Sequence, residues 1–219
     1  MRDGMLELRD IRVSKGDDTL MTVDLNVPAG TIATIMGPSG VGKSTLLSLI
    51  GGTLDPVFSA KGDIILDGVN LGSVPPEKRQ IGILFQDELL FPHMTVSQNL
   101  AFGLRQGGTA AQRCDQVRHA LAQIGLSDFE RADPATLSGG QKARVSLMRT
   151  LLSDPRALLL DEPFSRLDSD LRDRMRQLVF GHAKERNIPV LMVTHDKQDA
   201  DAAGGPVINV GSDRQNLAE

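Results

Sequence analysis

Residues 37–45 read Gly-Pro-Ser-Gly-Val-Gly-Lys-Ser-Thr and follow directly on an apolar run, Thr31 to Met36. They complete the phosphate-binding pattern G-x-x-x-x-G-K-[S/T], and the apolar run predicts a buried strand that leads into it. We expect the three glycines to let backbone N–H groups curl around anionic oxygens, at the start of a helix near Lys43. A glycine-rich turn that binds nothing is the alternative, but the strand-turn-helix order favours a nucleoside triphosphate site.

Two side chains of this loop suit the chemistry of a triphosphate with its metal. Lys43 can reach the β- and γ-phosphates, and the hydroxyl of Ser44 is placed to ligate Mg²⁺. The residues expected to surround the nucleotide are Gly37, Pro38, Ser39, Gly40, Val41, Gly42, Lys43, Ser44 and Thr45. A nucleoside triphosphate and Mg²⁺ are therefore the predicted ligands.

Length and composition indicate a globular chain with one substantial core. The 219 residues carry a net charge of −4, which argues against a nucleic-acid partner because phosphate backbones select basic surfaces. The single cysteine, Cys114, leaves no internal disulfide, suits a reducing cytosol and is expected to pack on a helix. No apolar stretch is long enough to cross a bilayer, and the first residues lack the apolar segment of a secretory signal.

Hydrophobic patterning predicts an antiparallel sheet in the N-terminal part of the chain. Apolar and polar residues alternate at 6–13 and again at 22–27, as they do in half-buried strands. Residues 63–66 predict a further strand, which the Asp-Gly turn at 67–68 closes.

The rest of the chain predicts a parallel sheet and helices. Continuous apolar runs at 81–85, 157–160 and 190–193 fit strands that are covered on both faces. Apolar residues at helical spacing predict one helix with Cys114, Val117, Leu121 and Ile124 inward, and a second after Ser138 with Val145, Met148, Leu151 and Leu152 inward. A third helix is expected over 168–187.

These elements predict an α/β fold within a single nucleotide-binding domain, residues 1–219. The domain has a phosphate-loop NTPase (RecA-like) core with a mainly parallel sheet, and an N-terminal antiparallel β subdomain. Core and β subdomain together are expected to comprise residues 1–86 and 151–219. An inserted α-helical subdomain is expected over residues 87–150.

Two carboxylates follow the apolar run at 157–160. In a phosphate-loop core the first, Asp161, can hold Mg²⁺ through water opposite Ser44. The second, Glu162, is then free to polarise a water for in-line attack on the γ-phosphate, because adjacent side chains of a strand point to opposite sides. A solvated turn is the alternative, and the phosphate loop upstream disfavours it.

Residues 137–141, Leu-Ser-Gly-Gly-Gln, resemble the signature motif of ATP-binding-cassette (ABC) ATPases. The serine also reads as an ordinary N-cap before a flexible glycine turn. The same physics makes an anion site, because Ser138 and the N–H groups of Gly139 and Gly140 lie at a helix N-terminus, next to Gln141. The resemblance implies that this site clamps the γ-phosphate of an ATP bound by the opposite subunit of a homodimer.

Three further positions match motifs of that family in the expected order. Gln86 looks like the Q-loop glutamine, which implies contact with Mg²⁺ and the attacking water. Asp168, in Ser165-Arg166-Leu167-Asp168, looks like the D-loop aspartate that crosses the dimer interface. His195 resembles the switch histidine that touches the γ-phosphate. The resemblance spans residues 5 to about 200 and implies ATP-driven closing and opening of the dimer.

Residues 86–100 are similar to the segment of importer ATPases that seats a coupling helix of the permease. Burial within the helical subdomain is the alternative for the apolar residues Leu89, Leu90, Phe91 and Met94. The short chain resembles the thiamine-type and related uncharacterised importer subunits. The resemblance implies permease subunits and an external substrate-binding protein as partners, and a cytoplasmic position on the inner face of the cell membrane.

Two departures from the family pattern bear on function. Residues 13–16 lack the aromatic on which many members stack adenine, so base affinity and the preference for ATP over GTP are expected to be weak. Arg166 stands where a small residue is common, and an interfacial ion pair and simple exposure are both open.

Other function classes remain as alternatives. A soluble ABC ATPase that acts on nucleic acid, ribosomes or protein complexes is the first. A GTPase or small-molecule kinase is another, against which stand the missing Asn-Lys-x-Asp motif and the signature at 137–141.

Overall fold

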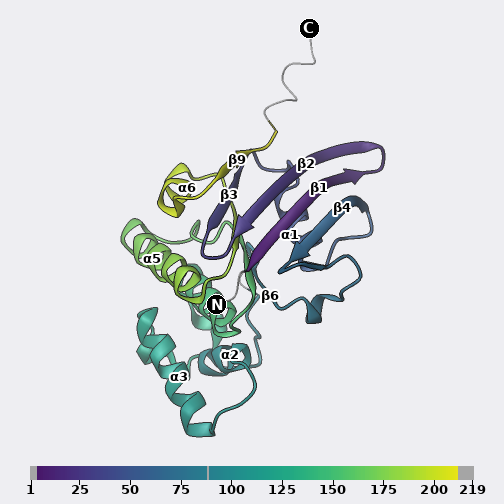
Figure 1. The fold of residues 1–219 in the computed structure, drawn as a ribbon. Helices are drawn as coiled ribbons and strands as arrows, with labels where there is room; N and C mark the ends of the chain where they lie inside the picture. Colours follow the sequence, from purple (N-terminus) through teal and green to yellow (C-terminus); the bar gives the residue numbers. More distant parts are fainter. Residues whose placement is uncertain (1–3, 88, 212–219) are drawn as a thin grey trace.

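The fold combines two sheets with helices on both sides of the larger one (Figure 1). The computed structural model describes residues 4–87 and 89–211. The strands are β1 (Met5–Lys15), β2 (Asp18–Pro28), β3 (Ile32–Met36), β4 (Phe58–Leu66), β5 (Val69–Asn70), β6 (Ile81–Leu84), β7 (Ala157–Asp161), β8 (Val190–Thr194) and β9 (Val207–Asn209). The α-helices are α1 (Lys43–Gly51), α2 (Val96–Gly103), α3 (Ala110–Gln123), α4 (Gly139–Leu152), α5 (Ser169–Arg186) and α6 (Lys197–Ala203). Short 3₁₀ turns lie at Pro76–Lys78, Ser127–Phe129 and Pro134–Thr136.

The larger sheet is parallel, with strand order β6-β7-β8-β3-β9. Its central strands are apolar throughout because both of their faces are covered. Along β7, Leu158 and Leu160 pack into the core shared with α4 and α5, whereas Ala157 and Leu159 pack into the core shared with α1 and the second sheet. The alternation of side chains along one strand therefore joins two cores, and the carboxyl ends of these parallel strands meet at one edge.

The smaller sheet is antiparallel, with strand order β2-β1-β4-β5. The turn at Asp67-Gly68 joins β4 to β5, with both residues at positive φ (51° and 77°). The α/β fold with a parallel phosphate-loop sheet and an N-terminal antiparallel sheet is confirmed.

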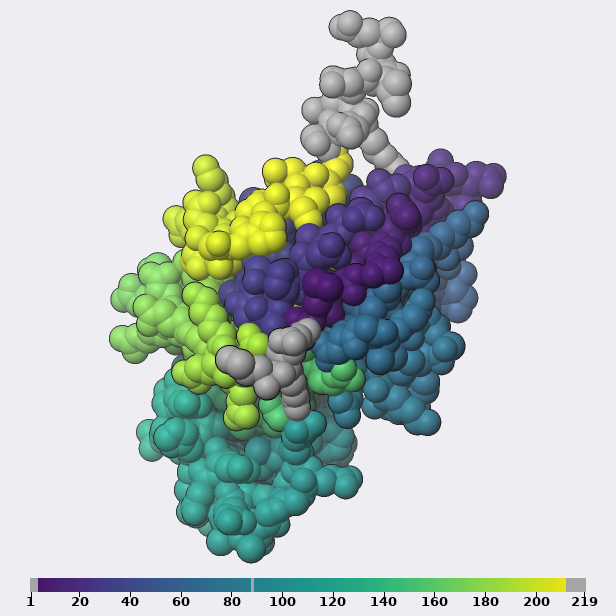
Figure 2. Space-filling view, in the orientation of Figure 1, coloured from purple at the N-terminus to yellow at the C-terminus, as the bar shows by residue number. Residues whose placement is uncertain are grey.

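The described residues between β6 and β7 contain helices and turns but no strand. In the space-filling view the teal surface of α2 and α3 lies at the opposite end of the molecule from the purple strands (Figure 2). Helices α2, α3 and α4 each begin with a reciprocal capping box, built on Thr95, Thr109 and Ser138. The boundaries of a helical subdomain at 87–150 stay a prediction.

Some element ends differ from those expected. Strand β6 stops at Leu84, and Phe85 is exposed beyond it. Asp168 and Asn187, expected inside a helix, are the N-cap and C-cap of α5. The patterning also left out α2, α6 and β9. No helix among the described residues combines the length and apolarity needed to cross a membrane.

Candidate nucleotide-binding site

The phosphate loop joins β3 to α1 with its backbone donors free of side-chain caps. The N-cap of α1 is Gly42, at φ 99°, and in the described part of the chain no side chain makes a capping hydrogen bond at this helix start. Gly40 also lies at positive φ (81°), a conformation that favours glycine. Gly37 is required for another reason, because a Cβ placed there would lie 2.5 Å from the carbonyl oxygen of Val210. The first-turn N–H groups are thus available to an anion.

Lys43 lies within the curve of this loop. Its Nζ donates hydrogen bonds to the carbonyl oxygens of Gly37 at 2.6 Å and Pro38 at 2.8 Å. The residue is only 8% exposed, whereas Ser39 and Gly40 of the loop are exposed. The ammonium group therefore sits beside the backbone that is expected to hold the phosphates, and its positive charge is held in a fixed place.

Asp161, the last residue of β7, is buried and faces α1 across the sheet edge. Burial raises the pKa of the Asp161 carboxyl, and the charge of Glu162 adds to that rise; a hydrogen bond with Ser44 and the charge of Lys43 act in the opposite direction. Ser44 and Asp161 supply a hydroxyl and a carboxylate oxygen side by side, which are donors that Mg²⁺ accepts together with phosphate and water. Within residues 4–87 and 89–211, no cluster of three or more His, Cys, Asp or Glu side chains could hold a metal by itself.

Glu162 lies one residue beyond β7 and has a left-handed backbone, with φ 49°. The alternation of strand side chains, which was expected to separate Asp161 from Glu162, is therefore the wrong reason for their different placement. The Glu162 N–H donates to the Val193 carbonyl at 3.0 Å. Its Oε1 lies 2.8 Å from His195 Nδ1, and its Oε2 accepts a hydrogen bond of 3.3 Å from the Thr194 hydroxyl.

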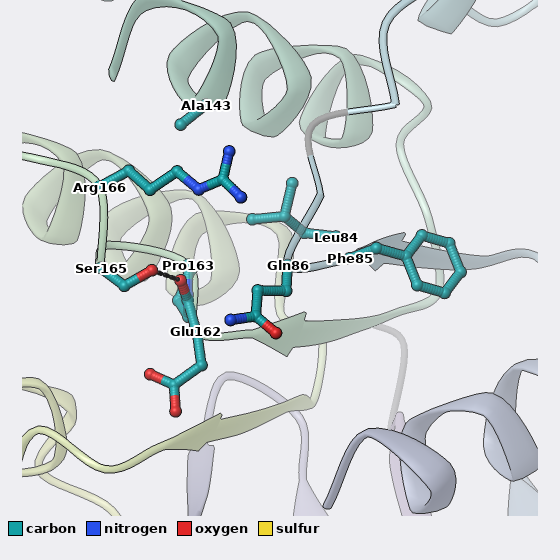
Figure 3. Close-up of a pocket in the computed structure, with 8 residues that line it drawn as sticks. All are labelled: Leu84, Phe85, Gln86, Ala143, Glu162, Pro163, Ser165 and Arg166. Carbon is teal, nitrogen blue, oxygen red and sulfur yellow. Dashed lines mark hydrogen bonds between the residues drawn. The ribbon is translucent and has the colours of Figure 1, made fainter. Parts of the chain in front are cut away.

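A pocket brings Gln86 to the same place as Glu162 (Figure 3). The pocket is lined by Leu84, Phe85, Gln86, Ala143, Glu162, Pro163, Ser165 and Arg166. In the close-up the Gln86 amide and the Glu162 carboxylate extend from just beyond the ends of β6 and β7 toward the lower part of the pocket. The ends of β6, β7 and β8 thus place Gln86, Glu162 and His195 at one edge of the sheet.

Arg166 reaches across this pocket from the segment after Glu162. Its Nη2 lies 3.3 Å from Asp87 Oδ1, so it forms an ion pair within its own chain, and the two side chains are 41% and 81% exposed. This is a contact that neither expectation for Arg166 included. Exposed ion pairs of this kind contribute little to stability, about 0–1 kcal/mol.

The signature residues lie on a different element. Ser138 caps α4: its Oγ accepts from the Gln141 N–H at 3.3 Å, and its own N–H donates to Gln141 Oε1 at 2.8 Å. Ser138 and Gly139 are exposed, and a Cβ placed on Gly139 would meet nothing within 4 Å. Among the described residues, no hydrogen bond links Ser138 to the phosphate loop. Asp168 is likewise exposed and caps α5, its Oδ1 accepting from the Leu171 N–H at 3.0 Å.

The segment after Gln86 is organised by a buried amide. Asn99, 0% exposed, accepts from the Phe91 N–H at 2.8 Å and donates to the Phe91, Met94 and Thr95 carbonyls. The Phe91 ring packs edge-on against Phe102 at 4.6 Å. Arg149 of α4 lies 5.0 Å over the same ring.

Part of this segment remains exposed rather than buried in the helical region. Leu89 is 59% exposed and Phe102 62%, whereas Leu90, Phe91 and Met94 are partly buried. We call Leu89, Phe91 and Phe102 the apolar patch.

Sequence reasoning missed the groups behind the catalytic candidates. Arg176 of α5 donates to the Asp199 carboxylate of α6, and both side chains are almost fully buried. Asp199 in turn faces the Thr194 hydroxyl. No local sequence pattern marks these residues. A buried charged side chain does indicate a functional or structural role, but its burial becomes known only from the structure.

Comparison with known proteins places this arrangement in a family. The profile described as "ABC transporter" matches residues 20–165. An uncharacterised ABC transporter ATP-binding protein, YnjD of Escherichia coli, is 48% identical and covers 90% of this chain and 92% of its own. The thiamine import ATP-binding protein ThiQ of Vibrio vulnificus is 45% identical over 90% of this chain and 83% of its own. Import ATP-binding proteins for spermidine and putrescine also match, and the chain spans about half of their length.

Solved structures agree with these relatives. The dimeric structure of MJ0796, described as a bacterial ABC transporter cassette, has a TM-score of 0.80 and 30% identity, covering 93% of both chains. A post-hydrolysis dimer of the same protein is described as bound to ADP and phosphate. The import ATP-binding proteins among the relatives favour the importer interpretation over a soluble ATPase that acts on nucleic acid, ribosomes or protein complexes. The chain therefore belongs to the ABC transporter family, as one of its ATP-binding ATPase subunits.

Proposed function

We propose that this chain powers a membrane importer by closing with a second copy on ATP and reopening after hydrolysis. The observation that carries the proposal is the division of the site between two elements. Lys43, Asp161, Glu162 and His195 gather at the carboxyl edge of the parallel sheet, whereas Ser138 is exposed on α4 and bonded to its own helix. A second copy is what would bring a Ser138 to the phosphates held by Lys43.

The residues of one copy would bind and activate the substrate. The backbone of 37–45 and the Lys43 ammonium hold the β- and γ-phosphates, with Ser44, Asp161 and Gln86 as the oxygen donors for Mg²⁺, which neutralises charge on the phosphates when bound. Glu162 accepts a hydrogen bond from the attacking water and takes up its proton. The water oxygen bonds to the γ-phosphorus as the bond to the bridging oxygen breaks, and that oxygen leaves with ADP. His195 holds Glu162 in place and faces the γ-phosphate, and Gln86 positions the water.

The second copy would complete the site. Ser138, Gly139, Gly140 and Gln141 present a helix N-terminus that favours the γ-phosphate, and Asp168 crosses the interface. ATP links the two copies, and loss of the γ-phosphate removes that link. The result is a population shift between a closed and an open dimer, set by how much more tightly ATP binds the closed one.

The coupling partner would be the permease, with an external substrate-binding protein delivering the cargo. Two residues of the apolar patch, Leu89 and Phe91, follow Gln86 closely in the sequence, and Asn99 and Arg149 hold the Phe91 region in place, so a coupling helix seated there would act on the segment that bears Gln86. Docking to the permease would place the chain on the cytoplasmic face of the membrane. No nucleic acid is expected as a partner. The core with its antiparallel β subdomain would then comprise residues 1–86 and 151–219, and the helical subdomain residues 87–150.

The decisive experiment measures ATPase rate per chain against protein concentration. The rate should fall on dilution as the dimer dissociates, and light scattering should detect a dimer only with Mg-ATP and slow turnover. A protein that remained a monomer yet hydrolysed ATP at an unchanged rate per chain at every dilution would overturn the proposal.

A further inference from the structure

Thr194, the last residue of β8, carries a buried hydroxyl that lies between two carboxylates. Its Oγ1 is 3.3 Å from Glu162 Oε2 and 3.2 Å from Asp199 Oδ2, and the residue is 0% exposed. The same oxygen accepts a hydrogen bond of 3.0 Å from the Asp196 N–H. Glu162 and Asp199 lie on different elements, so this hydroxyl joins the end of β7 to α6.

A hydroxyl has one proton to donate. Because both carboxylates accept, their two contacts compete for that single proton, while the Asp196 N–H donates to a lone pair of Oγ1. A proton donated to Glu162 leaves Asp199 without it, and the reverse also holds. What decides between them is how well each carboxylate is compensated by other donors.

Asp199 has strong donors of its own. The Arg176 guanidinium donates to Asp199 Oδ1 through Nε at 2.8 Å and also through Nη2, and the two side chains are 8% and 3% exposed. A buried charge pair of this kind is favourable only when its remaining groups are well bonded. Both bonds go to Oδ1, and among the described residues the Thr194 hydroxyl is the hydrogen-bond partner of Oδ2. The Arg176 charge lowers the cost to Asp199 of leaving Oδ2 without the Thr194 proton, a compensation that Glu162 lacks in the described structure.

Glu162 depends more on this hydroxyl. Within the described part of the chain, Oε2 accepts from Thr194, and Oε1 is within hydrogen-bond distance of the exposed His195 ring. Its left-handed backbone is a conformation that surrounding contacts must maintain in a residue with a Cβ. In Figure 3 its carboxylate points away from Ser165 and Arg166. The buried bond from Thr194 therefore fixes a side chain whose other contact is open to solvent.

We infer that Thr194 is a positioning residue for the reaction: its hydroxyl orients the Glu162 carboxylate, and the Arg176–Asp199 pair leaves its proton available for that task. The inference rests on the proposed role of Glu162. It predicts that loss of the hydroxyl acts on turnover rather than on ATP binding, because the hydroxyl bonds to Glu162 and, among the described residues, makes no hydrogen bond to the phosphate loop.

The test compares Thr194→Val, which keeps the shape of the side chain, with Thr194→Ser, which keeps the hydroxyl. A matched control is Thr34→Val, because Thr34 of β3 is equally buried in the same sheet and its hydroxyl has no partner among the described residues. Thr194→Val should lower kcat about 10- to 100-fold with KM changed less than about twofold, since a hydrogen bond to a charged group is lost. Thr194→Ser should remain within about threefold of the unmodified chain, and Thr34→Val should be unchanged in kcat.

Glu162→Gln, assayed in parallel, separates this inference from the proposed function. If Glu162→Gln abolishes turnover while Thr194→Val retains it in full, Thr194 does not position Glu162 and the inference alone fails. If Glu162→Gln itself retains turnover, the proposed role of Glu162 fails first. A Thr194→Ser variant as slow as Thr194→Val would also refute the role of the hydroxyl. Should Thr194→Val not fold, Thr194→Ala takes its place, with ATP-dependent dimer formation as the check on folding.

Discussion

The carboxyl edge of the parallel sheet and the N-terminus of α4 both present groups that suit an anion, but the side chains of the two regions are held by different kinds of contact. At the sheet edge, Lys43 is held by bonds within its own loop, whereas Asp161 bonds to Ser44 and Glu162 to Thr194, each from another part of the chain. At α4, Ser138 is exposed and bonded only within its own capping box in the described structure. This difference fits the function proposed above, in which the sheet edge binds the phosphates and the start of α4 completes the site of a second copy.

The largest effect is expected from Glu162→Gln, which breaks the sheet edge at its reacting group. The variant should lose turnover by about 10³-fold, because a general base or water-orienting carboxylate contributes about 10²- to 10⁴-fold. ATP binding should survive, since Lys43 and the loop backbone are untouched. ATPase assays together with size-exclusion chromatography in Mg-ATP should find an inactive protein that accumulates as an ATP-bound dimer. Turnover near that of the unmodified chain would remove Glu162 from this role.

The next effect tests the α4 side, with a control that the chain itself supplies. Thr109 caps α3 with a box like that of Ser138: its N–H donates to Gln112 Oε1 at 2.8 Å and its Oγ1 accepts from the Gln112 N–H at 3.2 Å. Ser138→Ala and Thr109→Ala should therefore destabilise the fold similarly, by about 1 kcal/mol each. Only Ser138→Ala should slow hydrolysis, by about 10- to 100-fold.

Thermal unfolding and ATPase rates of the two variants give the answer together. Equal losses of activity in both would mean that Ser138 serves α4 alone. An ATPase rate that Ser138→Ala left unchanged would lead to the same conclusion. The N-terminus of α4 would then have no part in hydrolysis.

The strands and the phosphate loop were predictable from sequence because their signals are local. A strand covered on both faces is apolar throughout, as at 157–160, and glycines at positive φ mark the loop. Capping boxes are equally local, so the start of α4 at Ser138 followed from its own neighbours. The candidate site residues could be predicted for the same reason, because they adjoin such signals.

The network behind Glu162 was not predictable, because the contacts that link it to Glu162 and to α5 join distant parts of the chain. Thr194 lies 32 residues from Glu162, and Arg176 lies 23 from Asp199. The ion pair between Arg166 and Asp87 spans 79 residues. Such pairings depend on how strands and helices pack, and no spacing within one element encodes them.

A smaller effect is expected at the apolar patch, which lies at the far end of α4 from Ser138. Phe91→Ala removes the ring that packs on Phe102 and under Arg149, so it should weaken assembly with the permease by about tenfold, as truncation of an interface anchor commonly does. ATPase activity of the isolated chain should change little. Phe58→Ala, on the antiparallel sheet, is the matched control.

Co-purification with the proposed permease subunits measures this effect. Equal recovery of Phe91→Ala and the unmodified chain would argue that the patch is not the docking surface. It would not bear on the two anion-binding regions, whose tests use the isolated protein.

The smallest effect concerns the stability of the sheet edge itself. Burial raises the pKa of Asp161 in the folded chain above its ordinary value of 3.8, which the unfolded chain keeps. Between the unfolded and the folded pKa, the folded chain therefore retains a proton that the unfolded chain has lost. The folded state binds more protons there, so its free energy of unfolding should decrease as pH rises through the window. Asp161→Asn should abolish this slope, and in the absence of nucleotide and metal the variant should be at least as stable as the unmodified chain near neutral pH. Chemical denaturation at a series of pH values measures the slope and the stability of the variant. In a separate binding assay, Mg²⁺ should raise the ATP affinity of the unmodified chain but not that of Asp161→Asn. If the decrease in unfolding free energy with pH persisted in Asp161→Asn, another titrating group would be its cause. A strongly destabilised variant would show that the charged carboxylate stabilises the fold, whereas we expect it to destabilise the fold in return for binding the metal.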